Sequence, residues 1–278
     1  MKAALVEANG AQIPAIGLGT WKLREDDGAE AVRWAIESGY RHIDTAARYE
    51  NEDAVGAGIR ASGLPRDELF VTTKVWHSEL KADDFRRSVE GSLKRLGLSH
   101  VDLLLIHWPN ADIPLSETLG ALNEAKTQGL ARHIGVSNFS ARLVREAARL
   151  SREPLVVNQC EYHPYLDQTK VREACRENGL AFTSYCPLGK GDLVNHPVIQ
   201  AIAAQHGKTG GQIILRWHVQ QPGTVAIPKS GNRQRIAENL DVFDFALSDE
   251  EMRRISGLAR PDGRMVRPGW DMDFEDAA

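Results

Sequence analysis

Short apolar runs alternate with longer amphipathic stretches almost to the end of this chain, and this rhythm restricts the fold more than any other feature. Strands that alternate with helical patterns are typical of parallel sheets, in which a helix joins each strand to the next. The pattern predicts an α/β fold. The candidate strands are residues 15–20, 42–44, 70–74, 101–107, 133–137, 156–159, 181–185 and 225–228.

Helical patterns lie between these strands, and a glycine stands at the end of several. The clearest helices are residues 27–38, 82–96, 117–128 and 198–205, with Gly39, Gly97, Gly129 and Gly207 at their ends. Glycine commonly ends a helix because it adopts the left-handed conformation without strain. Eight strand–helix units predict a closed (β/α)₈ barrel, a fold of about 250 residues.

The beginning of the chain predicts a separate β-hairpin. Residues 4–6 and 12–14 flank Asn9-Gly10, a pair that favours a type I′ turn. We expect this hairpin to cover the bottom of the barrel. Because no linker or block of charge divides the sequence, we expect one barrel domain over residues 1–278.

Composition argues against several classes of protein. The formal net charge of −4 and the scattered Lys and Arg residues give no basic surface for nucleic acid. No segment approaches the roughly 20 apolar residues of a membrane helix, and we expect a cytoplasmic monomer with no membrane partner. The three cysteines have no CxxC spacing, so we expect neither a disulfide framework nor a metal site.

Ionisable residues close three neighbouring candidate strands. Asp44 ends the second strand and is followed by Tyr49, while Lys74 and His107 end the next two. The active site of such a barrel lies at the carboxyl ends of its strands. Singly, each residue could be structural, such as a core histidine or a lysine that reaches the rim. Together, at one rim, they indicate a catalytic site.

Seven segments, in order along nearly the whole chain, resemble the aldo-keto reductase family, and most of all its bacterial 2,5-diketo-D-gluconate reductases. The resemblance implies a catalytic tetrad of Asp44, Tyr49, Lys74 and His107, and a nicotinamide cofactor, usually NADPH. The segments are GYRHIDTAARYEN at 39–51, TTKVW at 72–76, LLIHWP at 104–109, IGVSNF at 134–139, NQCEYHP at 158–164, SYCPLG at 184–189 and IPKSGNRQRIAEN at 227–239.

The four residues also suit carbonyl reduction on chemical grounds. Reduction needs a hydride at carbon and a proton at oxygen, and a nicotinamide supplies only the hydride. Tyr49 can donate the proton if a neighbouring cation favours its ionised form, and Lys74 is the predicted cation. Asp44 would keep Lys74 charged, while His107 would orient the carbonyl group.

The later strands predict the cofactor site. Ser137, Asn138 and Gln159 suit a carboxamide, although they could equally cap loops, and the resemblance implies that Tyr185 stacks on the nicotinamide. Cations flank a predicted helix start near residue 232, which suits a phosphate group. The predicted contacts are Gly19, Thr20, Trp21, Asp44, Ser137, Asn138, Gln159, Tyr185, Cys186, Pro187, Leu188, Gly189, Ile227, Lys229, Ser230, Gly231, Asn232, Arg235, Glu238 and Asn239.

Aromatic residues predict an apolar mouth for a small carbonyl substrate. By the resemblance, the short acidic tail at 260–278 folds over this mouth, where Arg264, Arg267 and Trp270 would shape specificity. Trp76 and Trp270 could also be simple packing residues. The predicted substrate contacts are Trp21, Tyr49, Trp76, His107, Trp108 and Trp270.

Two glycine motifs carry little weight. Gly56-Ala57-Gly58 lies inside a helical stretch and not at a strand-to-helix turn, so it is a poor dinucleotide fingerprint. The segment HGKT at 206–209 lacks the first glycine of a phosphate-binding loop.

The expected function is NADPH-dependent reduction of small aldehydes and ketones, such as keto-acids, diketo-gluconate and methylglyoxal. Two other classes stay open. In an aldolase-type barrel, Lys74 would form a Schiff base with the substrate, which gives no role to Lys229, Arg235 and Tyr185. A regulatory barrel would retain the cofactor without turnover, and the intact tetrad argues against it.

Overall fold

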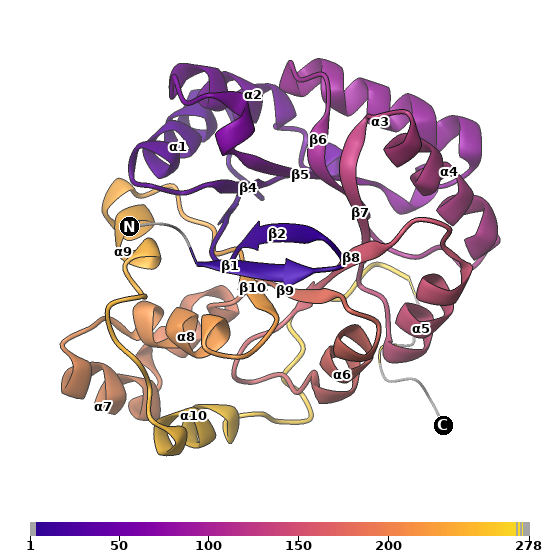
Figure 1. Cartoon of the computed structure of the whole chain (residues 1–278). Helices are drawn as coiled ribbons and strands as arrows, with labels where there is room; N and C mark the ends of the chain where they lie inside the picture. Colours follow the sequence, from indigo (N-terminus) through magenta and orange to yellow (C-terminus); the bar gives the residue numbers. More distant parts are fainter. Residues whose placement is uncertain (1–3, 271, 273, 275–278) are drawn as a thin grey trace.

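The computed structural model describes residues 4–270, 272 and 274. Its main sheet has eight parallel strands that pair in chain order (Figure 1). The Gly17 N–H donates to the Ala226 carbonyl at 2.9 Å, and Ile16 bridges Ala226, so the last strand joins the first and closes the sheet. The strands are β3 (Leu18–Gly19), β4 (His42–Asp44), β5 (Phe70–Val75), β6 (Val101–Ile106), β7 (Ala131–Ser137), β8 (Leu155–Glu161), β9 (Ala181–Tyr185) and β10 (Thr224–Ala226).

The predicted (β/α)₈ barrel is therefore confirmed, with changes at the strand ends. Of the predicted strand at 15–20, only Leu18–Gly19 forms a regular ladder. Ile16 makes an isolated β-bridge with Ala226 of β10 and does not extend the strand. The predicted strand at 156–159 continues to Glu161.

Helices form a ring outside the barrel (Figure 1). The glycines predicted to end helices do so: φ is +108° at Gly39, +68° at Gly97, +76° at Gly129 and +63° at Gly207. The helices are α1 (Glu25–Glu37), α2 (Glu52–Ala61), α3 (Ala82–Leu96), α4 (Leu115–Thr127), α5 (Ala141–Leu150), α6 (Thr169–Glu177), α7 (Pro197–His206), α8 (Gly210–Val219), α9 (Arg233–Leu240) and α10 (Asp249–Ser256), with short 3₁₀ turns η1 (Ala47–Tyr49), η2 (Arg66–Glu68), η3 (His77–Glu79) and η4 (Gly189–Asn195).

The two discarded glycine motifs have structural roles. A Cβ atom at Gly56 would lie 2.2 Å from the Leu96 carbonyl oxygen, and one at Gly58 would lie 2.4 Å from that of Ala29. These glycines let α2 pack closely against α3 and α1. In the second motif, Gly207 ends α7 and Thr209 caps α8.

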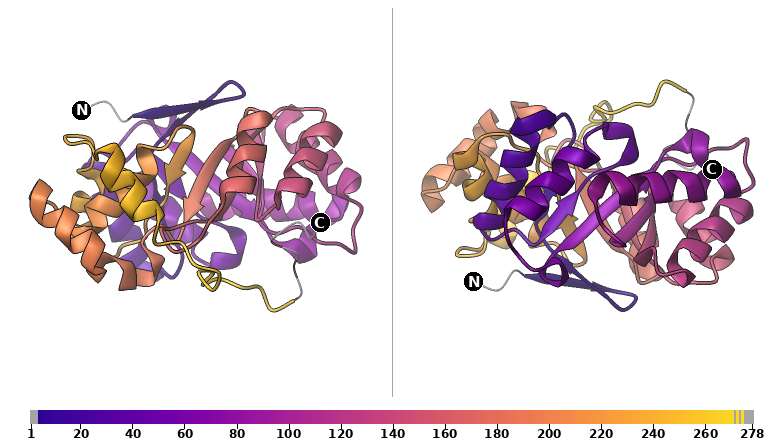
Figure 2. Two further views of the ribbon diagram at one scale, coloured as in Figure 1. Left: turned by 90° about the horizontal axis from the view of Figure 1, so that it is seen from below. Right: turned by 90° about the horizontal axis from the view of Figure 1, so that it is seen from above.

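The predicted hairpin is present and covers one end of the barrel. Strands β1 (Leu5–Ala8) and β2 (Ala11–Pro14) are antiparallel, and φ is +43° at Asn9 and +87° at Gly10, as a type I′ turn requires. Figure 2 shows the hairpin at the end of the molecule opposite to the C-terminal segment. The buried hairpin residues Ala8, Ala11 and Ile13 pack on the lowest layer of the barrel. That layer consists of Phe70, Leu103, Leu105, Val156, Val157, Ala181 and Val225.

The inside of the barrel changes from apolar to polar along each strand. Alternate residues of a strand point to the same face, so Phe70, Thr72 and Lys74 form three successive levels on β5. Phe70 belongs to the apolar layer beside the hairpin, whereas Lys74 lies near the opposite end. The polar end is therefore the carboxyl end of the strands, where the predicted site lies. Among the described helices, none has the length and apolar character needed to cross a bilayer.

Candidate active site

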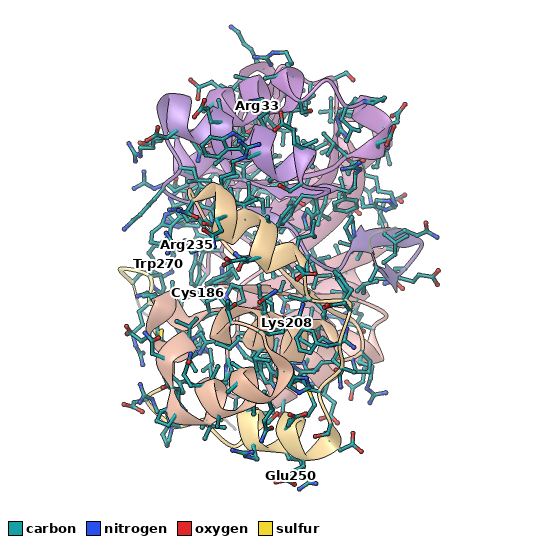
Figure 3. All side chains as sticks on the ribbon, turned by 90° about the vertical axis from the view of Figure 1, so that its left-hand side faces the viewer. Arg33, Cys186, Lys208, Arg235, Glu250 and Trp270 are labelled. Carbon is teal, nitrogen blue, oxygen red and sulfur yellow. The ribbon has the colours of Figure 1, made fainter. Side chains whose placement is uncertain are left out.

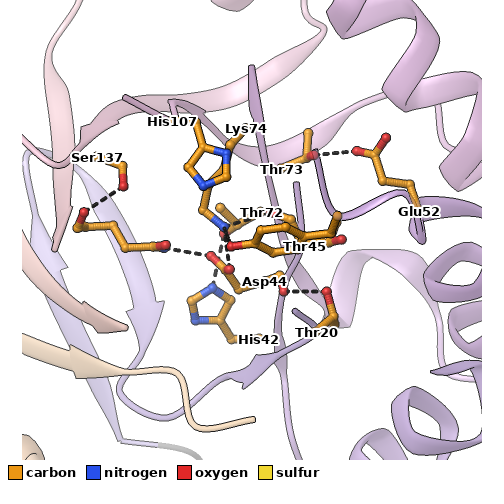
Figure 4. A network of polar contacts seen from close by, with 12 residues as sticks. Thr20, His42, Asp44, Thr45, Glu52, Thr72, Thr73, Lys74, His107 and Ser137 are labelled. Atoms are coloured by element: carbon orange, nitrogen blue, oxygen red, sulfur yellow. Dashed lines mark hydrogen bonds and ion pairs between the residues drawn. The ribbon is translucent and has the colours of Figure 1, made fainter. Parts of the chain in front are cut away.

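Lys74 is the centre of the candidate site (Figure 4). Its Nζ donates to Asp44 Oδ1 at 2.5 Å, to the Thr45 carbonyl oxygen at 2.8 Å and to the Tyr49 hydroxyl at 3.4 Å. Parallel pairing of β4 with β5 brings Asp44 and Lys74 together, and η1 returns Tyr49 over them. All three donor positions of the ammonium group are thus used.

The pKa of Lys74 agrees with the expectation that Asp44 keeps this residue charged, whereas the pKa of Tyr49 is not lowered. Burial acts to lower the pKa of Lys74, but Asp44 and Tyr49 outweigh it, and this pKa lies above its ordinary value. We expected Lys74 to make Tyr49 easier to ionise. Lys74 does act in that direction, but burial outweighs it and raises the pKa of Tyr49 above its ordinary value. Tyr49 is therefore protonated at neutral pH, and Lys74 limits the cost of its ionisation.

His107 lies beside Tyr49 at the end of β6. The two rings meet edge to face with centroids 5.6 Å apart, and Trp76 lies 5.1 Å from the His107 ring on another side. Burial, together with the Lys74 and Arg48 charges, holds the pKa of His107 well below its ordinary value. The imidazole is therefore neutral and can donate one hydrogen bond. Its buried Nδ1 has no hydrogen-bond partner among the residues that the structure describes.

The residues predicted to bind a carboxamide form a network with the four predicted catalytic residues. Gln159 Nε2 donates to Asp44 Oδ2 at 2.7 Å, and the Ser137 hydroxyl donates to the Gln159 carbonyl oxygen at 2.7 Å. Asn138 Nδ2 donates to the His107 carbonyl oxygen at 2.9 Å and its Oδ1 accepts from the Tyr185 hydroxyl at 2.8 Å. The sequence did not reveal that Gln159 holds the second oxygen of Asp44.

Lys229 and Arg235 flank the start of α9. Asn232 Oδ1 caps this helix by accepting from the Arg235 N–H at 3.0 Å, and Ser230 Oγ accepts from the Asn232 N–H at 3.1 Å. Lys229 and Arg235 are exposed, and within the described part of the chain neither has an ion-pair partner. This arrangement suits an anionic ligand. Glu238, also predicted at the site, accepts from Gln234 at 2.7 Å.

Most of the remaining predicted cofactor contacts lie in loops at the same end, whereas Gly19 ends β3 and Asn239 lies in α9. A Cβ atom at Gly19 would lie 2.8 Å from the Ile227 carbonyl oxygen, so the first loop lies close against the segment before Lys229. The Cys186–Gly189 turn closes with a hydrogen bond of 3.0 Å. In Figure 3, Cys186, Arg235 and Trp270 lie toward one edge of the molecule, opposite to the hairpin.

Aromatic side chains meet at the mouth of the barrel. Trp270 packs edge to face against Trp76 and Trp108, with centroids 5.9 Å away in each case, and lies 4.0 Å from the His77 ring. His77 was not predicted. Trp21 is different: it is 54% exposed, and Lys22 Nζ lies 4.5 Å above its ring. Of the tail predicted at 260–278, residues 271, 273 and 275–278 lie outside the described residues.

No group of three or more His, Cys, Asp or Glu side chains that could hold a metal ion occurs in the described ranges 4–270, 272 and 274. In the same ranges, all three cysteines are free thiols.

Together, the closed barrel and the buried Asp–Lys–Tyr network at its carboxyl end define a barrel oxidoreductase. A sequence model described as "Aldo/keto reductase family" matches residues 15–260. The chain belongs to the aldo-keto reductase family, a family that uses NADP(H).

Individual relatives are similar to this chain over at least 90% of its length. Glyoxal reductase of Bacillus subtilis (strain 168) is 43% identical over 251 residues, covering 90% of each chain. A solved structure provisionally described as a 2,5-diketo-D-gluconic acid reductase B is 46% identical, with a TM-score of 0.93 over 96% of this chain and 97% of that one. The Bombyx mori aldo-keto reductase, solved in complex with NADP, is 38% identical, with a TM-score of 0.89 over 96% of each chain. The resemblance found in the sequence motifs is confirmed.

Proposed function

We propose that this protein is an NADPH-dependent reductase of small aldehydes and ketones. The observation that carries the proposal is the position of the Lys74 ammonium group between the buried Asp44 carboxylate and the Tyr49 hydroxyl. This arrangement supplies a protonated acid together with a fixed cation that stabilises its conjugate base.

Tyr49 is the proposed proton donor. A bound dihydronicotinamide would supply the hydride. The Tyr49 hydroxyl would pass its proton to the carbonyl oxygen of the substrate, which would become the hydroxyl group of the alcohol. The negative charge left on the Tyr49 oxygen faces Lys74 Nζ, 3.4 Å away. Asp44 and the Thr45 carbonyl fix that cation in place, so no reorganisation is needed during the reaction.

His107 is the proposed orienting group. Because its imidazole is neutral, it can donate a hydrogen bond to the substrate oxygen without competing as an acid. Trp76 and Tyr49 pack against its ring and fix its orientation. The carbonyl group would thus be held between two donors.

The cofactor would lie across the carboxyl end of the barrel. Lys229, Arg235 and the N-terminal N–H groups of α9 would hold phosphate groups, and the pair of free cations favours the 2′-phosphate of NADPH. Gln159 and Asn138 would meet the carboxamide, and Tyr185 would stack on the nicotinamide ring. The donor set present fits this cofactor, since its cations lack ion-pair partners within the described residues.

The state of Lys74 disfavours the aldolase alternative. A Schiff base forms from an unprotonated amine. Lys74 is buried, its pKa is raised, and its three donor positions are used by Asp44, Thr45 and Tyr49. It therefore suits a fixed cation and not a nucleophile.

For the substrate, we propose short keto-acids, diketo-gluconate and methylglyoxal-type aldehydes, because the mouth is lined by aromatic rings and relatives carry the names glyoxal reductase and diketogluconic acid reductase. The test follows NADPH absorbance over a panel of methylglyoxal, 2,5-diketo-D-gluconate, aromatic aldehydes and keto-esters. We expect carbonyl-dependent oxidation of NADPH and no adduct trapped by borohydride. Absence of turnover with every member, while NADPH still binds, would favour the regulatory barrel.

A further inference from the structure

Glu161 is a fully buried carboxylate that the proposed mechanism does not use. It is the last residue of β8, and its side chain is 0% exposed. Two residues earlier on the same face of the strand, Gln159 binds Asp44. A buried charge is costly unless it is paired and hydrogen-bonded, so the partners of Glu161 indicate its role.

Those partners come mainly from the C-terminal segment at 263–270. Glu161 Oε1 accepts from the Met265 N–H at 2.6 Å, and Oε2 accepts from the Val266 N–H at 2.9 Å. Arg264 Nη1 lies 3.8 Å from Oε2, and His163 Nε2 lies 3.0 Å from Oε1. One carboxylate thus holds two consecutive backbone N–H groups with charge-assisted hydrogen bonds, the stronger kind.

Apart from Glu161 and the ring contacts of Trp270, the segment has few attachments among the described residues. It contains no helix or strand, so its backbone has no ladder of its own. Its start is fixed by Gly263, where a Cβ atom would lie 1.8 Å from the Tyr165 carbonyl oxygen, and Lys190 Nζ donates to the Met265 carbonyl at 2.8 Å. Glu161 is the buried part of this attachment.

Four residues beyond Val266, the segment places Trp270 at the mouth. Trp270 contacts Trp76, which in turn contacts the His107 ring. Strand β8 therefore makes two connections: Gln159 binds Asp44 in the predicted catalytic site, and Glu161 binds the segment that carries Trp270.

We propose that Glu161 is a positioning residue that fastens the segment at 263–270 and so sets the affinity of the mouth for carbonyl substrates. The predicted effect on substrate affinity rests on the proposed function. The attachment of the segment at 263–270 by Glu161 does not depend on whether the protein turns over a substrate. Glu161 takes no part in proton or hydride transfer, because it meets the tail and not Tyr49 or Lys74.

The central variant is Glu161→Gln, which keeps the shape but replaces one acceptor oxygen with an N–H donor. Glu251→Gln is the matched control, because Glu251 also pairs with a histidine, His206 at 2.8 Å, but lies on the outer helix α10. Val266→Pro removes one N–H from the tail side and leaves the barrel unchanged, so it tests the same hydrogen bond if Glu161→Gln does not fold.

The first measurement is tryptic cleavage of the full chain after Arg264, at the bond to Met265. We expect Glu161→Gln and Val266→Pro to be cleaved about ten times faster than the wild type, the factor for loss of one charge-assisted hydrogen bond, while Glu251→Gln is cleaved at the wild-type rate. This readout requires no activity. Wild-type cleavage rates in both test variants would overturn the inference.

The second measurement is steady-state reduction of 4-nitrobenzaldehyde by NADPH. In Glu161→Gln, we expect KM for the aldehyde to rise about tenfold, while kcat changes by less than about twofold and the NADPH dissociation constant stays the same. Because Glu161 acts through Trp270, a Glu161→Gln/Trp270→Ala variant should have the KM of Trp270→Ala alone. Additive effects on KM, or a fall in kcat alone, would overturn the inference. Faster cleavage in an enzyme without any turnover would instead reject the proposed function.

Discussion

Lys74 Nζ lies 2.5 Å from Asp44 Oδ1, and the exposed fractions of the two side chains are 0% and 1%. This ion pair joins β5 to β4, and the amide of Gln159 on β8 holds the other oxygen of Asp44 at 2.7 Å. Three strands thus fix one carboxylate. Since a buried charge without its partner is strongly destabilising, the site and the stability of the barrel are coupled.

Lys74→Met should lower both stability and activity. It leaves the Asp44 carboxylate buried without a counter-charge, so we expect the free energy of unfolding to fall by about 3–5 kcal/mol. Turnover should fall by about 10²-fold or more, because the Tyr49 phenolate loses its stabilising cation. Urea unfolding and NADPH oxidation measure the two effects. An Asp44→Asn/Lys74→Met variant should regain part of the stability but none of the activity; equal stability of the single and double variants would contradict this account.

Tyr49→Phe should remove activity without affecting cofactor binding. It deletes one hydroxyl group and keeps the ring against His107, so we expect turnover to fall by about 10²–10⁴-fold, with little change in the NADPH dissociation constant. Tyr162→Phe is the control, because it removes a hydroxyl that bonds to Gln221 at 3.0 Å, away from the site. If Tyr49→Phe keeps more than about a tenth of the turnover, another group donates the proton.

Arg235→Ala should weaken NADPH binding more than NADH binding. A charge-assisted contact with the 2′-phosphate contributes about 1.5–3 kcal/mol, so we expect the NADPH dissociation constant to rise by one to two orders of magnitude. Fluorescence quenching at fixed salt measures both cofactors. Arg233→Ala serves as the control on the same helix. The Arg233 Cζ atom lies over the Trp34 ring, 5.9 Å from its centroid, so this cation already contacts another part of the chain. Equal losses for both cofactors would remove Arg235 from the 2′-phosphate role.

Two buried histidines should make the protein less stable in acid. Burial lowers the pKa of His42 to about 4 and that of His218 to about 3. In the unfolded chain both histidines take up a proton near pH 6.5, whereas in the folded protein they do so only near pH 4 and pH 3. The free energy of unfolding is therefore unaffected by these groups above about pH 6.5, and it decreases as the pH falls from 6.5 toward 4 and 3. For His42 the loss at pH 4 is on the order of 3 kcal/mol.

Urea unfolding between pH 7 and pH 4 measures this dependence. His218→Gln should flatten it, because the amide keeps a donor for the Pro187 carbonyl but does not titrate. An unchanged slope in this variant would show that His218 does not contribute to acid sensitivity.

The network around Asp44 shows where sequence-based prediction stopped. That the four predicted catalytic residues lie at one rim could be inferred from the sequence, because each ends or follows a recognisable strand and in a parallel barrel all strand ends meet at one rim. The bond from Gln159 to Asp44 joins residues 115 positions apart on strands that are not paired with each other. No local pattern encodes such a contact.

The effect of Lys74 on the pKa of Tyr49 was predicted correctly, but the net raised pKa was missed for a related reason. The sequence identified the cation but not the burial, and burial has the larger effect on this hydroxyl group. Glu161 was missed because the predicted strand ended at Gln159. One more pleat of β8 brings Glu161 to the inner face, where the tail meets it.

The sequence by itself determined the eightfold strand–helix rhythm, the Asn9-Gly10 hairpin and the glycines that end helices, because side-chain period and backbone conformation are local properties. Tertiary structure decided which amide holds Asp44, how strongly Tyr49 keeps its proton, and which backbone N–H groups of the C-terminal segment bind Glu161. These depend on closure of the barrel, which brings distant residues into contact and removes water from around their charges.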